Sequence, residues 1–335
     1  MKKILLNITF GLIITTLNAQ QDRHYSMFYA SPMTMNPAST GFFQGDIQLF
    51  TNYRNQWSSI NPSLFKTISA SVDTRLFEDA MDGNFVGAGL NIYNDVAGDS
   101  KLTTNVYNLS FSYALEISQD QKLSFGVQPS LLQRSIKNSD LSWDNQWTGA
   151  EFNTSISNNE SIFAGKSTEF DLNAGVYYYG RPNDDLLLNF GLAGSHILSP
   201  ENSLLNSDEK LYRKITIHGG AEISTRSNLV IVPNFYLFQQ GPNSSLALGS
   251  DFRYILKESS RYTGYNDETS ISLGAYYRLK DALYTTFFVN WNSLSFGASY
   301  DINLSSFSVA TGGVGAFEFL LRYRIKTGKS GVSSL

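Results

Sequence analysis

The sequence predicts an all-β protein, a transmembrane antiparallel β-barrel of about 14 strands. Between residues 45 and 326, short segments of alternating apolar and polar residues are separated by turn residues. None of these segments is long and apolar enough to be a membrane-crossing helix. The chain of 335 residues also begins with a segment typical of export signals. Behind an export signal, this alternation is typical of a closed barrel in an outer membrane.

Residues 1–19 have the features of a signal peptide. Lys2 and Lys3 give a basic start, Ile4–Leu17 is mostly apolar, and Ala19 supplies a small residue at the cleavage position. The apolar part is short for a membrane span, which disfavours the alternative of an uncleaved anchor helix. We expect Sec-dependent export and cleavage after Ala19.

Composition excludes several classes of function. Loss of residues 1–19 removes two lysines and leaves 23 of the 25 basic residues against 29 acidic ones, so a nucleic-acid partner is not expected. The absence of cysteine excludes disulfides, thiol catalysis and thiolate metal sites. Charged residues are 16% and aromatic residues 14% of the chain, whereas a soluble domain is about 25% charged. This balance fits a barrel with lipid outside and water inside.

Each predicted strand separates an apolar from a polar face. Ile215, Ile217 and Ile223 fall on one face, and Thr216, His218 and Glu222 fall on the other. Fourteen strands are predicted: Gly45–Trp57, Leu64–Phe77, Asn84–Ile92, Leu102–Ile117, Lys122–Ile136, Phe170–Arg181, Leu186–Ile197, Arg213–Ser224, Asn228–Phe238, Ser244–Leu256, Thr269–Lys280, Leu283–Trp291, Leu294–Ile302 and Phe317–Ile325. An even number lets the antiparallel sheet close, as lipid requires. A soluble propeller is disfavoured because no repeat of blade length is present.

Connection lengths predict the orientation, since such barrels keep short turns in the periplasm. With both termini periplasmic, the periplasmic turns are Ser118–Gln121, Arg181–Asp185, Thr225–Ser227 and Asn292–Ser293. The long segments Asn138–Glu169 and Ser199–Tyr212 are then external. Lys257–Glu268 is the exception, a long connection on the periplasmic side.

Charged residues on the polar faces are predicted to line the lumen, because each would cost about 2–4 kcal/mol in mid-membrane. They are Arg54, Asp73, Arg75, Glu222, Asp251, Arg253, Arg278, Asp301, Glu318, Arg322 and Arg324. Asp301 is expected to pair with Arg322 and Arg324 on the neighbouring strand. Two interpretations stay open: the charges stiffen the wall by pairing, or they hold a plug or a partner segment. Ile217→Arg should impair assembly, and His218→Arg should be tolerated.

The sequence offers little for catalysis, so we expect neither an enzyme nor a cofactor. After the signal peptide the histidines are His24, His196 and His218. Ser195 and His196 are neighbours in a predicted strand, so they should point to opposite faces and not form a nucleophile–base pair. Asn94–Ser100 and Asp140–Asn145 could bind calcium, but the polarity of solvated loops explains them more simply.

Residues 20–43 differ from the strands. They are rich in aromatic residues and methionine, carry Pro32, and end in a turn-forming stretch with Asn36, Pro37, Ala38 and Gly41. Prolines argue against a wall strand. The segment is either a plug that folds into the lumen or a disordered lead-in below the rim.

Several strings together resemble the PorP/SprF family of outer-membrane proteins associated with type IX secretion. They are NPAxxG at Asn36–Gly41, YRNQW at Tyr53–Trp57, YNDVAG at Tyr93–Gly98, LSFGVQ at Leu123–Gln128, FDLNAGVYYY at Phe170–Tyr179, YRLKDAL at Tyr277–Leu283, ASYDI at Ala298–Ile302 and GAFEFLLRY at Gly315–Tyr323. Two departures are Phe317, where the family usually has histidine, and the polar tail Thr327–Leu335.

The resemblance implies a fourteen-stranded barrel similar to long-chain fatty-acid transporters, in the secretion and gliding-motility apparatus of Bacteroidota. It implies a partner role for a large surface adhesin, bound through its C-terminal sorting domain, and contacts with translocon or periplasmic ring components. We expect the external loops, with Trp143, Trp147 and Phe152, to bind the adhesin. The alternative is a channel or transporter for a small hydrophobic or oligomeric solute.

Overall fold

The computed structural model describes residues 22–59, 65–98, 100–136, 143–157, 166–201, 203–204, 209–257 and 268–326. The strands are β1 (Ile47–Gln56), β2 (Phe65–Leu76), β3 (Phe85–Ala97), β4 (Leu102–Ser118), β5 (Gln121–Ser135), β6 (Lys166–Asn183), β7 (Leu186–Ser195), β8 (Lys214–Ser224), β9 (Leu229–Gln240), β10 (Asn243–Lys257), β11 (Thr269–Arg278), β12 (Ala282–Trp291), β13 (Leu294–Asn303) and β14 (Val314–Ile325). The helical elements are the 3-10 turns η1 (Phe28–Ala30), η2 (Pro32–Thr34), η3 (Pro37–Ser39), η4 (Glu78–Ala80) and η6 (Asp144–Gln146) and the single turn α1 (Ser308–Thr311). Within these ranges, no helix has the length and hydrophobicity needed to cross a membrane.

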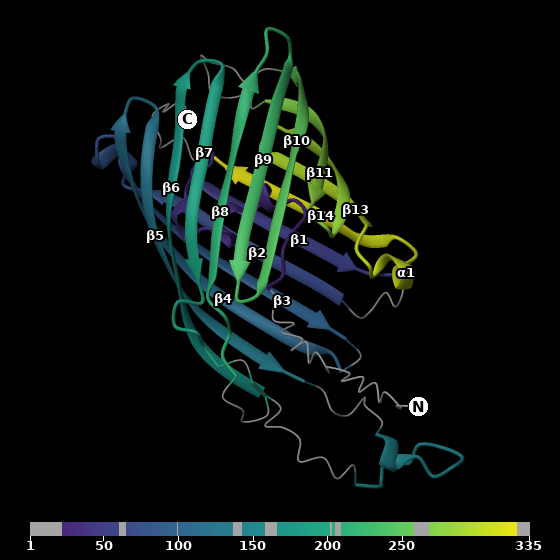
Figure 1. The fold of residues 1–335 in the computed structure, drawn as a ribbon. Coiled ribbons are helices and arrows are strands. Elements are labelled where there is room, and N and C mark those ends of the chain that lie inside the picture. The colour runs from purple at the N-terminus through teal and green to yellow at the C-terminus, as the bar shows by residue number, and fades with distance from the viewer. Residues whose placement is uncertain are drawn as a thin grey trace, which may run out of the picture.

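The strands form one closed barrel in sequence order (Figure 1). Each strand pairs antiparallel with the next, and β14 returns to pair with β1 from Ile47↔Ile325 to Gln56↔Ala316. The predicted fold class is therefore confirmed, including the number of strands. We call the end where β1 begins and β14 ends the basal end, and the opposite end the distal end.

Alternation along the strands separates an apolar outer face from a polar inner face. On β8, Ile215 is 58% exposed on the outside while Thr216 is 3% exposed on the inside. β14 has the same alternation of exposed and buried residues: Phe319 and Leu321 face outward, and Glu318 is fully buried. A period of two produces this division, and the outer face fits a lipid environment.

Several predicted boundaries were wrong. β3 continues to Ala97, so Asn94 and Asp95 lie in a strand and not in a loop. Asn94 donates a hydrogen bond to Asn105 of β4, and Asp95 accepts one from Thr67 of β2. β6 likewise extends four residues before and two after its predicted span. β7 ends at Ser195, two residues earlier than predicted. The next residue, His196, has a φ of +56°, which is left-handed and incompatible with an extended strand.

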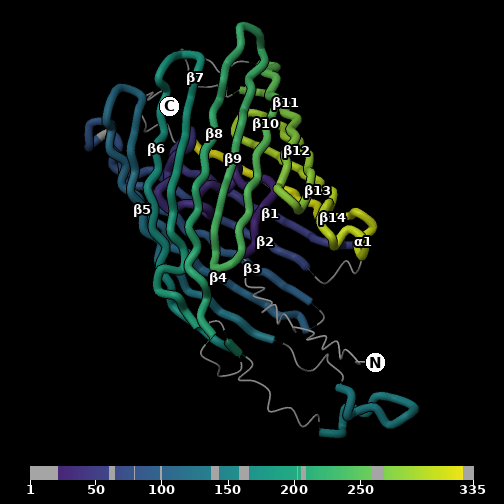
Figure 2. Tube along the Cα trace, in the orientation of Figure 1, coloured from purple at the N-terminus to yellow at the C-terminus, as the bar shows by residue number. Residues whose placement is uncertain are grey.

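Residues 22–43 lie inside the barrel, and we call them the inner segment (Figure 2). They run from the distal end, where Asp22 contacts Lys214 at the start of β8, to the basal end, where Phe43 contacts Arg75 near the end of β2. The core of the molecule lies between this segment and the wall. Phe28 packs on Tyr236, Phe238 and Tyr276, and Met27 packs on Phe50 and Leu320.

Candidate functional site

Asn36 attaches the stretch Asn36–Gly41 to the wall at the middle of the barrel. Asn36 caps η3, since its Oδ1 accepts from the Ala38 amide at 2.9 Å. Its Nδ2 donates to the Val176 carbonyl of β6 at 2.9 Å and lies 3.2 Å from Nε2 of His218 on β8. Asn36 is completely buried. One side chain therefore stabilises the turn and attaches it to the wall.

The wall makes room for this stretch with glycines on its inner face. A Cβ atom on Gly126 of β5 would lie 2.3 Å from the Ala38 nitrogen, and one on Gly175 of β6 would lie 2.1 Å from Asn36 Oδ1. A Cβ atom on Gly87 of β3 would lie 2.2 Å from the Thr40 carbonyl oxygen, and one on Gly191 of β7 would lie 2.6 Å from Asn36 Nδ2. Only residues without side chains permit so close an approach of two backbones.

Asp73 and Arg75 bind the inner segment where it leaves the basal end. The Gly41 amide donates to Asp73 at 3.1 Å, and Arg75 donates through Nε to the Gly41 carbonyl at 3.2 Å. Arg75 also donates to the Phe43 carbonyl and pairs with Glu78. Gly41 has a φ of +85°, which favours glycine at this turn.

Four of the predicted lumen charges form one buried cluster. Arg54 of β1 pairs with Glu318 of β14 at 3.1 Å and with Asp301 of β13 at 3.3 Å, and Arg278 of β11 pairs with Asp301 at 2.8 Å. All four side chains are at most 4% exposed. Two positive and two negative charges balance, which lowers the cost of burying them.

Ser26 of the inner segment completes this charge cluster. Its amide donates to Glu318 at 2.8 Å, its hydroxyl donates to Asp301 at 2.6 Å, and Arg54 donates to the hydroxyl oxygen at 2.7 Å. Asn52 adds a hydrogen bond to Glu318 at 2.8 Å. The same charges thus pair across the wall and bind the inner segment, so both interpretations of the lumen charges describe part of the geometry.

The expected pairing of Asp301 with Arg322 and Arg324 was wrong. Asp301 lies in the distal half of β13, while Arg322 is opposite Ser295 near the basal end of β14. Antiparallel register therefore places the charges at different heights. Arg322 donates to Ser295 at 3.4 Å, and Arg324 donates to Gln48 at 3.2 Å.

The remaining predicted charges form two smaller groups. Arg253 of β10 pairs with Glu222 of β8 and lies 3.7 Å from Glu268. Asp251 accepts hydrogen bonds from the Tyr276 hydroxyl and from Thr286, both at 2.6 Å. These groups connect β10 to β8, β11 and β12 of the wall.

The distal end of the inner segment is fixed by an ionic network. Asp22 accepts from Lys214 at 2.6 Å and from His196 Nε2 at 2.9 Å, and His196 Nδ1 lies 2.6 Å from Asp171. Burial opposes charge on His196, but Asp22 and Asp171 outweigh it and raise its pKa to about 9. Burial likewise opposes charge on Asp22, yet Lys214 and His196 hold its pKa well below the usual range. Asp22 and His196 are therefore both charged at neutral pH.

The expectation that Ser195 and His196 point to opposite faces was wrong, because β7 ends between them and both border the same cavity. Both ring nitrogens of His196 are nevertheless engaged by carboxylates. Among the described residues, no group of three or more histidine, aspartate or glutamate side chains could hold a metal ion.

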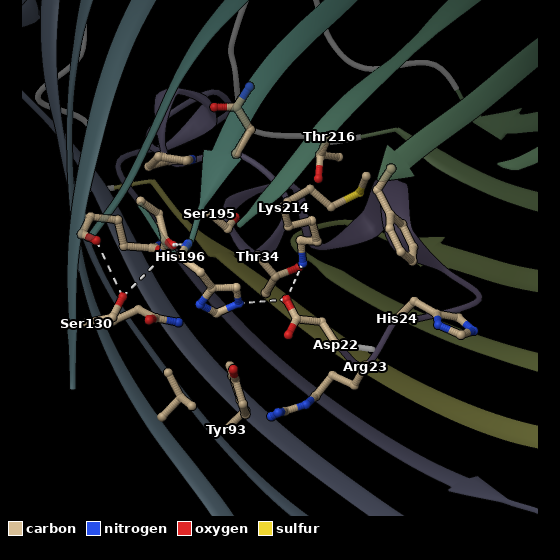
Figure 3. A pocket seen from close by; sticks show the side chains of 18 of the residues that line it. Asp22, Arg23, His24, Thr34, Tyr93, Ser130, Ser195, His196, Lys214 and Thr216 are labelled. Carbon is tan, nitrogen blue, oxygen red and sulfur yellow. Dashed lines mark hydrogen bonds and ion pairs between the residues drawn. The ribbon is translucent and has the colours of Figure 1, made fainter. Parts of the chain in front are cut away.

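A cavity lies between the inner segment and β3–β9 (Figure 3). It offers about 100 Å³ to the centres of water molecules. Arg23 and Tyr93 lie at one side, and Asp22, His196 and Lys214 lie beside them. Apolar lining comes from Phe28, Met35, Val106, Leu132, Tyr236 and Phe238.

The distal connections behave differently from one another. In the segment of residues 143–157, Trp147 and Phe152 form a β-bridge with their ring centres 5.0 Å apart, and both side chains are about half exposed. Trp143 is the N-cap of η6. In the β7–β8 connection, Leu211 instead packs on Val106 and Leu132. Residues 137–142 and 158–165 of the first connection, and 258–267 of the unusual β10–β11 connection, lie outside the described residues.

Sequence reasoning missed Ser26, Asp22 and the inner-face glycines. The sequence did contain a signal for the glycines, because Gly126 and Gly175 occupy polar-face positions of their strands. A side chain that faced only water there could be of any size, so glycine indicates that another backbone approaches closely. Asp22 and His196 left none, since their contact spans 174 residues.

Comparison with solved structures shows the same barrel fold at low identity. A monoaromatic hydrocarbon channel, the TodX deltaS2S3 mutant, aligns with a TM-score of 0.51 and 8% identity over 87% of this chain and 93% of that one. The toluene transporter TodX of P. putida aligns with a TM-score of 0.48 and 10% identity over 86% of this chain and 92% of that one. A Pseudomonas aeruginosa FadL homologue aligns with a TM-score of 0.45 and 10% identity, also over 86% of this chain and 92% of that one. No curated protein matches the chain in sequence.

A family model described as "Type IX secretion system membrane protein PorP/SprF" matches residues 17–323, nearly the whole chain. The match includes the inner segment, every strand but the last two residues of β14, and all the strings that carried the resemblance. The chain therefore belongs to the PorP/SprF family of type IX secretion system membrane proteins.

Proposed function

We propose that this protein is a non-enzymatic outer-membrane component of the type IX secretion and gliding-motility system of a member of the Bacteroidota. In this role it binds a large secreted adhesin through its C-terminal sorting domain and anchors it at the cell surface. The signal peptide, residues 1–19, is removed after Sec-dependent export, and the barrel of residues 44–326 lies in the lipid of the outer membrane.

The observation that carries this proposal is the inner segment. Hydrogen bonds attach it to β14 through Ser26, to β6 through Asn36 and to β2 through Gly41, so it is fixed along the length of the lumen. It acts as a plug, with Asn36, Pro37, Ala38 and Gly41 as its central turn. A protein cargo then binds to an end of the barrel and does not pass through it.

The distal end supplies the surface for the adhesin. With both termini in the periplasm, the exposed pair Trp147 and Phe152 lies outside the cell, and aromatic residues are common anchors at protein interfaces. The basal end, with the connection of residues 258–267 and the tail of residues 327–335, faces the periplasm and contacts ring or translocon components.

The test is affinity capture of the tagged native protein from its own cells, followed by mass spectrometry. We expect one large adhesin to be recovered, and Trp147→Ser combined with Phe152→Ser to reduce its recovery at least tenfold. Phe77→Ser is the matched control, because Phe77 is an exposed aromatic residue at the basal end. Equal recovery with wild type and the double variant would contradict the proposal.

A channel or transporter for a small hydrophobic or oligomeric solute is the second candidate. The internal cavity favours it, as does the likeness to a monoaromatic hydrocarbon channel. Solute-dependent conductance of the purified protein in planar bilayers, with no protein recovered in the capture experiment, would favour this candidate.

A further inference from the structure

The cavity beside the inner segment contains an arginine, Arg23, that forms no ion pair with the described residues. The carboxylates of Asp95 and Asp22 act on its charge only from beyond 4.0 Å. Nε and Nη1 of Arg23 are buried and donate no hydrogen bond to the described residues. Its Cζ atom lies 3.8 Å from the centre of the Tyr93 ring, which fixes the guanidinium plane against β3. Figure 3 shows Arg23 and Tyr93 together at one side of the cavity.

Lys214 and His196, the other two cationic residues that line the cavity, are already paired with carboxylates. Lys214 pairs with Asp22 at 2.6 Å, and Asp22 also accepts from His196 and Gln240. No described carboxylate lies within 4.0 Å of the Arg23 guanidinium. A planar guanidinium with two unpaired nitrogens at a half-buried site matches the geometry of a carboxylate.

Several more polar atoms of residues that line the cavity lack a protein partner among the described residues. Three of them are Oγ1 of Thr216, Oδ1 of Asn108 and Oδ1 of Asp171, and their residues are 3%, 6% and 2% exposed. Buried polar groups of this kind are normally hydrogen-bonded, so each calls for a partner in the cavity. Two of the three are acceptors, which require a donor such as a hydroxyl or amine.

The shape of the cavity fits an organic molecule better than water alone. Phe28, Val106, Leu132 and Tyr236 supply apolar walls. A water needs about 10–15 Å³ of the space available to its centre, and the cavity has about 100 Å³. A site with mostly apolar walls and a few fixed polar groups is typical of small-molecule binding.

We propose that this cavity binds a small organic acid whose carboxylate pairs with Arg23 and whose apolar body lies against Phe28, Val106 and Leu132. A hydroxyl or amine on the acid donates to Asn108 or Asp171. The acid would rest on the inner segment as well as on the wall, so binding would stabilise the filled barrel. This inference is independent of the proposed adhesin partnership.

The test uses the full-length mature protein in detergent, titrated with 4-hydroxybenzoate by calorimetry. The neutral analogue 4-hydroxybenzyl alcohol is titrated in parallel. We expect saturable binding of the acid and affinity at least about tenfold weaker for the alcohol, because only the acid makes the charged hydrogen bonds to Arg23.

Arg23→Gln should lower affinity for the acid about tenfold or more and leave affinity for the alcohol unchanged. Arg226→Gln is the control, because Arg226 is exposed in a basal turn outside the cavity and its loss removes the same charge. Should Arg23→Gln fail to fold, Arg23→Met replaces it, since it also removes the charge and keeps an unbranched side chain. Absence of acid binding, equal binding of acid and alcohol, or unchanged affinity in the Arg23 variants would each overturn the proposal.

Discussion

Arg54 of β1 and Glu318 of β14 stand opposite each other across the seam that closes the barrel, and their side chains form a buried ion pair at 3.1 Å. Both also bind Ser26 of the inner segment. The contacts that close the sheet and those that hold the inner segment are therefore made by the same two side chains. Loss of either one should affect closure and filling of the barrel together.

Arg54→Met should lower the free energy of unfolding by about 3–5 kcal/mol, because Glu318 would stay buried without its cation. Denaturant unfolding of the detergent-solubilised barrel, followed by heat-modifiable gel mobility, measures the change.

The double variant Arg54→Met/Glu318→Leu should be more stable than Arg54→Met alone. It removes one charge of each sign and leaves the pair of Arg278 and Asp301 at 2.8 Å. A double variant whose loss equals the sum of the two single losses would show that the pair is not coupled.

Gly175→Ala should displace the inner segment, because the new Cβ atom would lie 2.1 Å from Asn36 Oδ1. Overpacking of this kind costs about 1–3 kcal/mol. We expect greater protease sensitivity of residues 22–43 and higher conductance in planar bilayers. Gly194→Ala is the control, since the nearest atom to its Cβ would be 3.9 Å away. Equal conductance of both variants would argue against close packing at Gly175.

Ile215→Arg should impair assembly, because Ile215 is 58% exposed on the outer face and a charge there costs up to about 2–4 kcal/mol in lipid. Lys214→Arg, one residue away, faces inward and can keep the pair with Asp22, so it should assemble normally. The yield of heat-modifiable protein in membranes compares the two.

The structure changes the expectation for His218→Arg. His218 faces inward as predicted, but it contacts Asn36 and stacks on Tyr177 with ring centres 5.8 Å apart. An arginine there would disturb the inner segment, so this position is no suitable tolerated control.

The attachment of the distal end of the inner segment should weaken in alkali. The pKa of His196 is raised from 6.5 to about 9, so its stabilising charge is fully present below pH 6.5 and is lost as the pH rises through about 9. The lowered pKa of Asp22 acts in the other direction, and its stabilisation is lost only in acid. The melting temperature should fall between pH 6 and pH 9.5.

His196→Gln is the control for this pH dependence. Its melting temperature should be lower at pH 6 and should change less over the same range, because the titrating group is gone. A wild-type curve that stays flat to pH 10 would contradict the role of His196.

The strand pattern was readable from the sequence because alternation is a local property. Each strand of the barrel separates lipid from lumen, so the polarity of a residue such as Ile215 or Thr216 indicates which face it occupies. The errors at β3 and β6 arose where polar residues such as Asn94 pair across strands beyond the alternating part. Strand ends depend on the neighbouring strand as well as on local polarity.

The sequence by itself determined the export signal pattern, the strand number and the inward direction of the eleven charges, because these depend on order and polarity along the chain. Only the tertiary structure decided that Arg54, Arg278, Asp301 and Glu318 meet, that glycines on four strands receive Asn36–Thr40, and that Arg23 lies beside a cavity with no described carboxylate within 4.0 Å. Those relationships depend on the position of each residue along the barrel axis and on the path of the inner segment, whose sequence has no strand periodicity. Polarity specifies the face that a residue occupies, but only register and closure specify its partner.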